Sequence, residues 1–160
     1  MPTPTYTPIA TVTLTSAVPD VIFNNIPATY RDLILVATQG VASSMSAVLR
    51  FNTDAGVGNY RYQSFRGNGT TATAYGQATS YIAITETAFT TNTQYQIQIL
   101  DYSATDKGKT IVGRHNNAAN DASMVCGRWV GTAAIDRVVL TFFGVNATVG
   151  STFSLYGIVA

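Results

Sequence analysis

Alternating hydrophobic and polar residues recur along the chain and predict β-strands. The clearest run is 94–100, in which Tyr95, Ile97 and Ile99 share one face while glutamines occupy the positions between them. A period of two is typical of a strand with one buried face and one face in water. The chain therefore contains at least one half-exposed strand of antiparallel type.

Ten or eleven short runs of this kind follow one another, separated by stretches rich in Gly, Asn, Asp and Thr, which favour turns. They span 9–16, 20–27, 31–39, 46–52, 59–67, 80–85, 94–103, 109–116, 123–131, 134–144 and 152–160. The dense apolar run 31–39 is predicted to be a central strand covered on both faces. The stretch 67–76, GNGTTATAYG, has the glycines of a phosphate loop without a following helix, and we expect a loop there.

The pattern predicts a single all-β domain over residues 9–160, folded as an antiparallel jelly-roll-like β-sandwich. Residues 1–8 contain three prolines and are expected to form an extended N-terminal arm. That arm is either a disordered leader or a segment that lies across a neighbouring subunit. The final run alternates up to the end of the chain, so we expect it to be a paired strand inside a sheet.

The composition limits the partners that the protein can have. Charged residues make up 11% of the chain, against about 25% in average globular domains, and the net charge is +1. No basic patch of the nucleic-acid-binding type is expected, and no apolar run is long enough to span a membrane. The first residues do not form a signal peptide. A weakly charged surface promotes association, which indicates a protein that works in an assembly.

Candidate catalytic and metal-binding residues are few. A zinc site or a Ser-His-Asp triad would have to use His115, the single histidine, which we interpret as a polar residue at a strand end. Cys126 is the single cysteine and is interpreted as a small buried apolar side chain. We therefore expect no enzyme activity, no cofactor and no metal. One ion site stays open: the loop with Asn52, Asp54 and Asn59 is either a turn or a calcium-type oxygen cluster.

Aromatic residues crowd one region of the chain and are the best candidates for a binding surface. Tyr and Arg are enriched where proteins bind partners, but a strand face packed on the core would explain the same residues. The aromatic cluster consists of Tyr60, Tyr62, Phe65, Arg66, Tyr75 and Tyr81. Trp129 is interpreted as a core residue, with a ligand platform as the alternative.

Three motifs stand in order along the chain and carry a family resemblance. They are Ile26-Pro27-x-x-Tyr30-x-Asp32-Leu33, then Arg50-Phe51-Asn52-x-Asp54 with Gly56 and Tyr60, and finally Phe153 through Ile158 at the end of the chain. In these motifs, and over nearly the whole chain from Ile9, the sequence resembles a recurrent family of bacteriophage virion proteins. That family includes tail-fibre, receptor-binding and capsid-decorating components of tailed phages, and its members are mostly not enzymes.

The resemblance implies a non-enzymatic structural component of a virion, made in the cytoplasm of the host bacterium. We expect a capsid decoration or cement protein that stabilises the shell by contacts with the major capsid protein or other virion proteins. Such a protein would bind the assembled lattice and not its separated subunits. A homo-oligomer is expected, with a trimer as the favoured state. The alternative is a tail-fibre or baseplate module that contacts host-cell glycans through the aromatic cluster.

Overall fold

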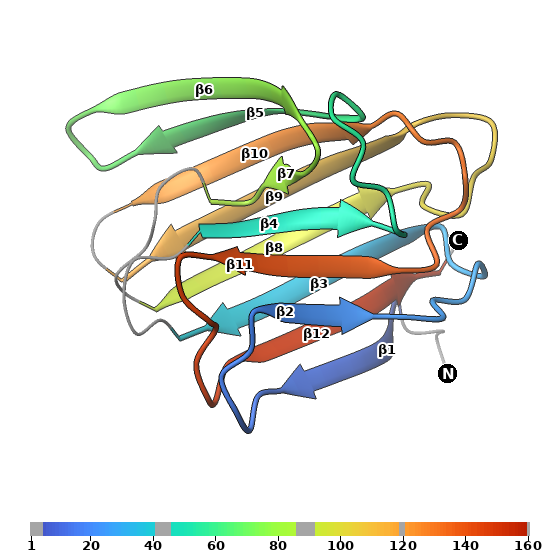
Figure 1. Cartoon of the computed structure of the whole chain (residues 1–160), viewed down its shortest axis with the longest axis horizontal. Coiled ribbons are helices and arrows are strands. Elements are labelled where there is room, and N and C mark those ends of the chain that lie inside the picture. Colours follow the sequence, from blue (N-terminus) through green and yellow to red (C-terminus); the bar gives the residue numbers. More distant parts are fainter. Residues whose placement is uncertain (1–4, 41–45, 86–91, 119–120, 160) are drawn as a thin grey trace.

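The computed structural model describes residues 5–40, 46–85, 92–118 and 121–159, which form two antiparallel sheets packed face to face (Figure 1). The larger sheet contains, in spatial order, β1 (Tyr6–Thr13), β12 (Thr152–Ile158), β3 (Asp32–Gln39), β8 (Thr93–Leu100), β9 (Lys109–Asn117), β10 (Ala122–Trp129), β5 (Tyr60–Gly67) and β6 (Ala72–Thr79). The smaller sheet contains β2 (Asp20–Phe23), β11 (Val138–Phe143), β4 (Ser46–Phe51) and β7 (Ile82–Ala83). The predicted antiparallel β-sandwich is confirmed.

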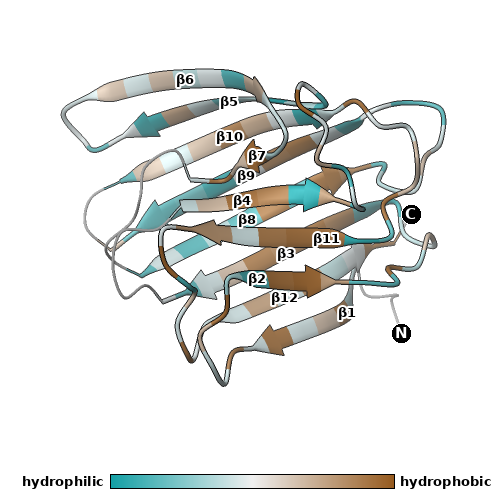
Figure 2. Ribbon diagram, viewed as in Figure 1, coloured by the Kyte–Doolittle hydropathy of each residue, from teal (hydrophilic) through white to brown (hydrophobic). Residues whose placement is uncertain are grey.

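The hydrophobic core lies between the sheets and is built from alternate residues of each strand. On β8, Tyr95, Ile97 and Ile99 are buried, while the glutamines between them lie on the other side of the sheet. Figure 2 shows the strands of the smaller sheet, β2 and β11 above all, dominated by hydrophobic residues. The described part of the chain contains no helix with the length and hydrophobicity needed to span a membrane.

The large sheet has one covered face and one face that the smaller sheet does not reach; we call the second the open face. The strand β3 is central, between β12 and β8, as its apolar run predicts. The prediction that both of its faces are covered holds for the first half of the strand, where the outward residues Asp32 and Ile34 are buried. It is wrong for the second half, where Val36 is 41% exposed and Thr38 is also exposed on the open face. An unbroken apolar run does not by itself reveal that its outer side faces solvent.

Both ends of the described chain are held in the large sheet. The closing strand β12 pairs with β1 on one side and β3 on the other, as its alternation predicts. Residues 6–8 of the expected arm are already part of β1, where Tyr6 lies opposite Ile158. The pairing register shifts between Pro8 and Ala10, because a proline cannot donate a ladder hydrogen bond.

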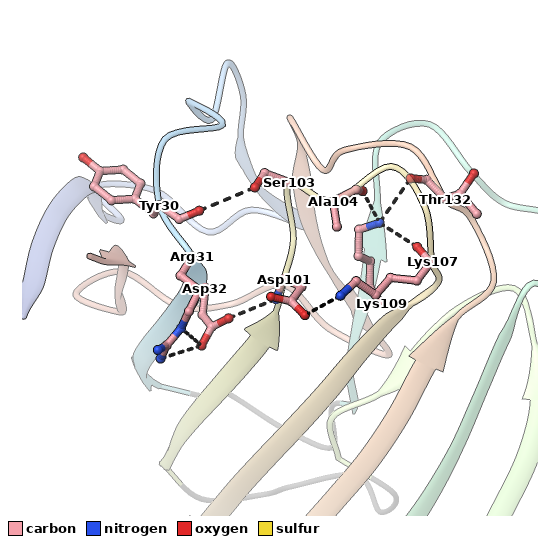
Figure 3. Close-up of polar contacts among 9 residues, drawn as sticks. All are labelled: Tyr30, Arg31, Asp32, Asp101, Ser103, Ala104, Lys107, Lys109 and Thr132. Carbon is pink, nitrogen blue, oxygen red and sulfur yellow. Dashed lines mark hydrogen bonds and ion pairs between the residues drawn. The ribbon is translucent and has the colours of Figure 1, made fainter. Parts of the chain in front are cut away.

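A polar cluster fixes the connection between β8 and β9 (Figure 3). The Lys109 side chain is fully buried, and its Nζ donates to the carbonyls of Ala104, Lys107 and Thr132 at 2.7, 3.0 and 3.2 Å. Burial lowers the pKa of Lys109, while the three carbonyls supply acceptors for its charged form. The ammonium group of Lys109 therefore connects the β8–β9 loop to the segment that follows β10.

Residues of the three motifs make contacts between segments that are far apart in the chain. The Asn52 amide donates to Ala134 O and accepts from the backbone of Asp136, which ties the end of β4 to the segment before β11. The Tyr30 ring lies against Gly157, where any Cβ would overlap with it. These contacts explain why the motifs favour this fold, but they do not themselves form a binding surface.

Candidate functional site

A cleft of about 570 Å³ opens where β5 and β6 extend past the smaller sheet. In Figure 1 this hairpin lies beyond β7, the last and shortest strand of the smaller sheet. The inward side chains of β5 are mostly buried, whereas those of β6 are mostly exposed, and both strands contribute to one wall of the cleft. The cleft is lined by Ser46, Val48, Tyr62, Ser64, Arg66, Thr73, Ala74, Tyr75, Gln77, Tyr81, Ala83, Thr85 and Phe143.

The cleft brings together four members of the aromatic cluster: Tyr62, Arg66, Tyr75 and Tyr81. The rings of Tyr62 and Tyr75 lie 6.4 Å apart, centroid to centroid. The hydroxyl of Tyr75 donates to Oε1 of Gln77 at 3.3 Å. Tyr75 is 50% exposed, so one face of its ring is available to a ligand. The combination of aromatic rings, hydroxyl groups and the Gln77 amide suits a polar ligand that also has an apolar face.

Tyr60 and Phe65 do not line this cleft, so the structure does not bring all six residues of the aromatic cluster together on one surface. Tyr60 is fully buried, and its ring stacks 6.3 Å from that of Trp129, centroid to centroid. Burial raises the pKa of Tyr60 to about 12. Phe65 is 51% exposed but points to the open face, because it differs from Tyr62 by an odd number of positions on β5. Trp129 is a core residue, as predicted.

An ion pair supports the rear of the cleft. Arg66 donates to Asp121 Oδ2 at 2.7 Å, and the Asn117 amide donates to the same oxygen at 2.9 Å. The Arg66 hydrogen bond lowers the pKa of Asp121 against the opposing effect of burial. The positive charge of Arg66 is thus balanced by the Asp121 carboxylate, which favours a neutral ligand over an anion.

His115 lies near the end of β9, as expected, but its side chain is buried in the interior. It is 6% exposed on β9 and stands opposite Ser123 of β10. Burial lowers the pKa of His115 to about 4, with Asp121 opposing and Arg66 adding to that shift. A histidine of such low basicity is a poor general base at neutral pH. Arg66 and the Asn117 amide both donate to Oδ2 of Asp121, so these two groups orient the carboxylate.

The loop with Asn52, Asp54 and Asn59 is organised by its own hydrogen bonds. Asp54 accepts from Trp129 Nε1 at 2.6 Å, from Gly56 N at 2.8 Å and from the Asn59 amide at 2.9 Å. Burial disfavours the Asp54 carboxylate, but these donors outweigh that effect and lower its pKa. Asn52 points to a different segment, so the three side chains do not converge on one point. The described residues contain no group of three His, Cys, Asp or Glu side chains placed to hold a metal ion.

Two parts of the surface were not predicted from the sequence. Residues 72–79 form β6 and not the expected loop, because the strand is exposed on both faces and has no apolar alternation to reveal it. Gln77 was missed with it. Cys126 is exposed on the open face and is not the buried residue that we expected. The alternation through 123–131 contained the signal, since Cys126 is out of phase with the buried Val125 and Trp129.

Comparisons with known proteins assign the chain to no family. No protein-family model matches the sequence, and no curated protein matches it. Among solved structures, a human SPRY domain has a TM-score of 0.39 at 9% identity, covering 94% of this chain and 96% of that one. Galectin-Ib of Xenopus laevis has a TM-score of 0.38 at 9% identity, covering 85% and 98%. Alginate lyase Aly36B has a TM-score of 0.33 at 12% identity, covering 89% and 70%. No functional assignment follows from similarities this distant.

Proposed function

We propose that this protein is a non-enzymatic structural component of a tailed-phage virion, a capsid decoration protein that docks through its open face. The three motifs of the sequence resemblance support the virion assignment. The observation that carries the docking assignment is the composition of the open face. Val36, Phe65, Val112 and Met124 are 41%, 51%, 39% and 53% exposed there.

The exposed apolar side chains alternate with glutamines and arginines in a continuous array. Cross-strand partners place Gln96 between Val36 and Arg114, and Met124 lies between Arg114 and Phe65. Protein interfaces are enriched in aromatic residues, Met and Arg, and are depleted of Lys, Asp and Glu. The outward positions of the described strands of this sheet contain no lysine, and their single carboxylate is buried. This composition favours contact with another protein.

The proposal predicts many copies of the chain per particle and a shell that resists heat and low salt less well when the gene is deleted. Val112→Glu, on the open face, should abolish incorporation into particles. Val57→Glu should leave it unchanged, because Val57 is 89% exposed and lies in the β4–β5 loop. The measurement is the stoichiometry of each variant against the major shell protein in purified particles. Full incorporation of Val112→Glu would contradict docking through this face.

A second candidate function is a tail-fibre or baseplate module that binds host-cell glycans, and the cleft at β5 and β6 favours it. Tyr75→Ala should then abolish binding of the purified protein to host cells. Tyr6→Ala is the matched control, since Tyr6 is 51% exposed on β1, at the opposite edge of the large sheet. Cell binding that competes with infection and depends on Tyr75 would favour this candidate over the decoration protein. Equal loss with Tyr6→Ala would exclude the cleft.

A further inference from the structure

Two arginines stand directly opposite each other on the open face. The antiparallel register of β10 and β5 pairs Arg128 with Arg61, and both side chains are exposed. Cross-strand neighbours have Cβ atoms about 5 Å apart, and like charges in this position destabilise a sheet. Thr110 of β9 and Ala78 of β6 occupy the next positions of the same row. The row therefore offers neither arginine a carboxylate.

Three of the described carboxylates are engaged in ion pairs with other cations. The ion pairs within the described residues join Arg31 to Asp32, Arg66 to Asp121 and Lys107 to Asp101. Asp32 is the single acid on the outward positions of the described large-sheet strands. It is 3% exposed and accepts from the Gln98 amide at 3.1 Å and from Asp101 N at 2.9 Å. The open face is therefore positively charged although the whole chain is close to neutral.

The two arginines line one hollow of about 510 Å³ on this face. Gln63, Thr110 and the exposed thiol of Cys126 line it as well. On its β6 side the outward residues are Gly76 and Ala78, so no large side chain covers the arginines from that strand. Guanidinium groups bind carboxylates in a planar, two-point geometry. The hollow thus combines two such groups with amide and hydroxyl donors.

The surroundings of the hollow favour a protein as the source of the carboxylate. Val112 is the cross-strand neighbour of Cys126, and Met124 is the neighbour of Phe65 in the adjacent row. These three apolar side chains are each at least 39% exposed. Apolar and arginine side chains in one patch are typical of protein interfaces. We propose that the Arg61–Arg128 hollow receives clustered Asp or Glu side chains of the protein on which the open face docks. This inference rests on the proposed function.

The test uses Cys126 as a reporter inside the hollow. Maleimide labelling of Cys126 is followed at low ionic strength with poly-L-glutamate, polygalacturonate or inorganic phosphate present. Poly-L-glutamate should slow the labelling in a saturable way. Arg61→Gln/Arg128→Gln should raise the concentration needed for half-protection on the order of tenfold, because charge-assisted hydrogen bonds are lost. Arg137→Gln is the control, since Arg137 lines a different hollow beside Asn24.

Three outcomes of this assay overturn the inference: no protection by poly-L-glutamate, equal protection by phosphate at the same charge concentration, or tighter protection by polygalacturonate. The last would assign the hollow to an acidic polysaccharide. Binding of the protein to purified shells separates the two proposals. If wild type fails to bind shells while poly-L-glutamate still protects Cys126, the docking function fails and the carboxylate site stands. If wild type and Arg61→Glu/Arg128→Glu bind shells equally well, the inference fails by itself.

Discussion

The two faces of the large sheet are made by the same strands and have opposite chemistry. On β8 the covered face presents Tyr95, Ile97 and Ile99, and the open face presents Gln94, Gln96 and Gln98. The covered side chains are at most 3% exposed. On β10 the buried Val125 and Trp129 alternate with exposed residues that include Met124 and Arg128. Each strand thus contributes alternately to the core and to the surface.

Because of this difference, we expect the covered face to determine the stability of the fold and the open face to determine binding. Side chains on the covered face lie in a dry interior, where lost contacts are not replaced by water. The exposed side chains of the open face are hydrated in the isolated protein, so changing them has little effect on folding. We therefore expect substitutions one position apart on a strand to differ by several kcal/mol in their effect on the free energy of unfolding.

The largest effect is expected from Ile97→Ala. Ile97 is fully buried on β8, with Gly113 opposite it and Val125 beside that glycine. Removing the side-chain atoms of Ile97 leaves a cavity, which should lower the free energy of unfolding by about 2–5 kcal/mol. Gln96→Ala, at the next position, is the control and should change it by no more than about 0.5 kcal/mol. Chemical denaturation measures both, and equal effects would break the separation of the two faces.

A pH-dependent loss of stability is expected from His115. The unfolded chain takes up a proton at the ordinary histidine pKa of 6.5, whereas burial lowers the folded pKa to about 4. The unfolded state therefore binds more protons as the pH falls from 6.5 to 4, and stability decreases over that window. At 1.36 kcal/mol per pKa unit the full loss is about 3 kcal/mol.

His115→Gln should flatten this dependence, because it removes the titrating group. Denaturation at pH 7, 6 and 5 measures the slope. Over this range the folded protein keeps the Asp54 and Asp121 carboxylates ionised, because the pKa of each is lowered from the ordinary value. An unchanged slope in His115→Gln would show that another group is responsible.

A smaller loss is expected from Lys109→Met. The substitution leaves the carbonyls of Ala104, Lys107 and Thr132 without their shared donor (Figure 3). Leaving buried acceptors unsatisfied should lower the free energy of unfolding by about 1–3 kcal/mol. Lys107→Met is the control: the Lys107–Asp101 pair is exposed to solvent, so thermal unfolding should hardly change. A large effect at Lys107 would contradict this assignment.

The smallest effect on stability is expected from Val36→Thr on the open face. Val36 is 41% exposed, and its replacement should change the free energy of unfolding by no more than about 0.5 kcal/mol. The same change should weaken incorporation into particles if the open face is the docking surface. A stability loss above 1 kcal/mol in the isolated chain would mean that this face is already covered, for example by a second copy.

The alternation of residues by itself determined the all-β class, the two-sided character of β8 and the pairing of the closing strand. These are local consequences of a period of two, and they need no knowledge of which strands meet. The alternation also places Cys126 on the exposed side of its strand. We expected it to be buried because cysteine is among the most buried residue types. The strand β6 is exposed on both faces, so its sequence shows no alternation from which a strand could be predicted.

Tertiary structure decided which strands share a sheet and which surfaces they leave uncovered. Tyr62, Tyr75 and Tyr81 form one cleft because the smaller sheet ends at β7, and nothing local indicates where that sheet ends. Arg61 and Arg128 are 67 positions apart and become neighbours only through the register of β5 and β10. Long-range pairing of this kind depends on the whole core packing at once, so the binding surfaces could not be read from the sequence although the strands that build them could.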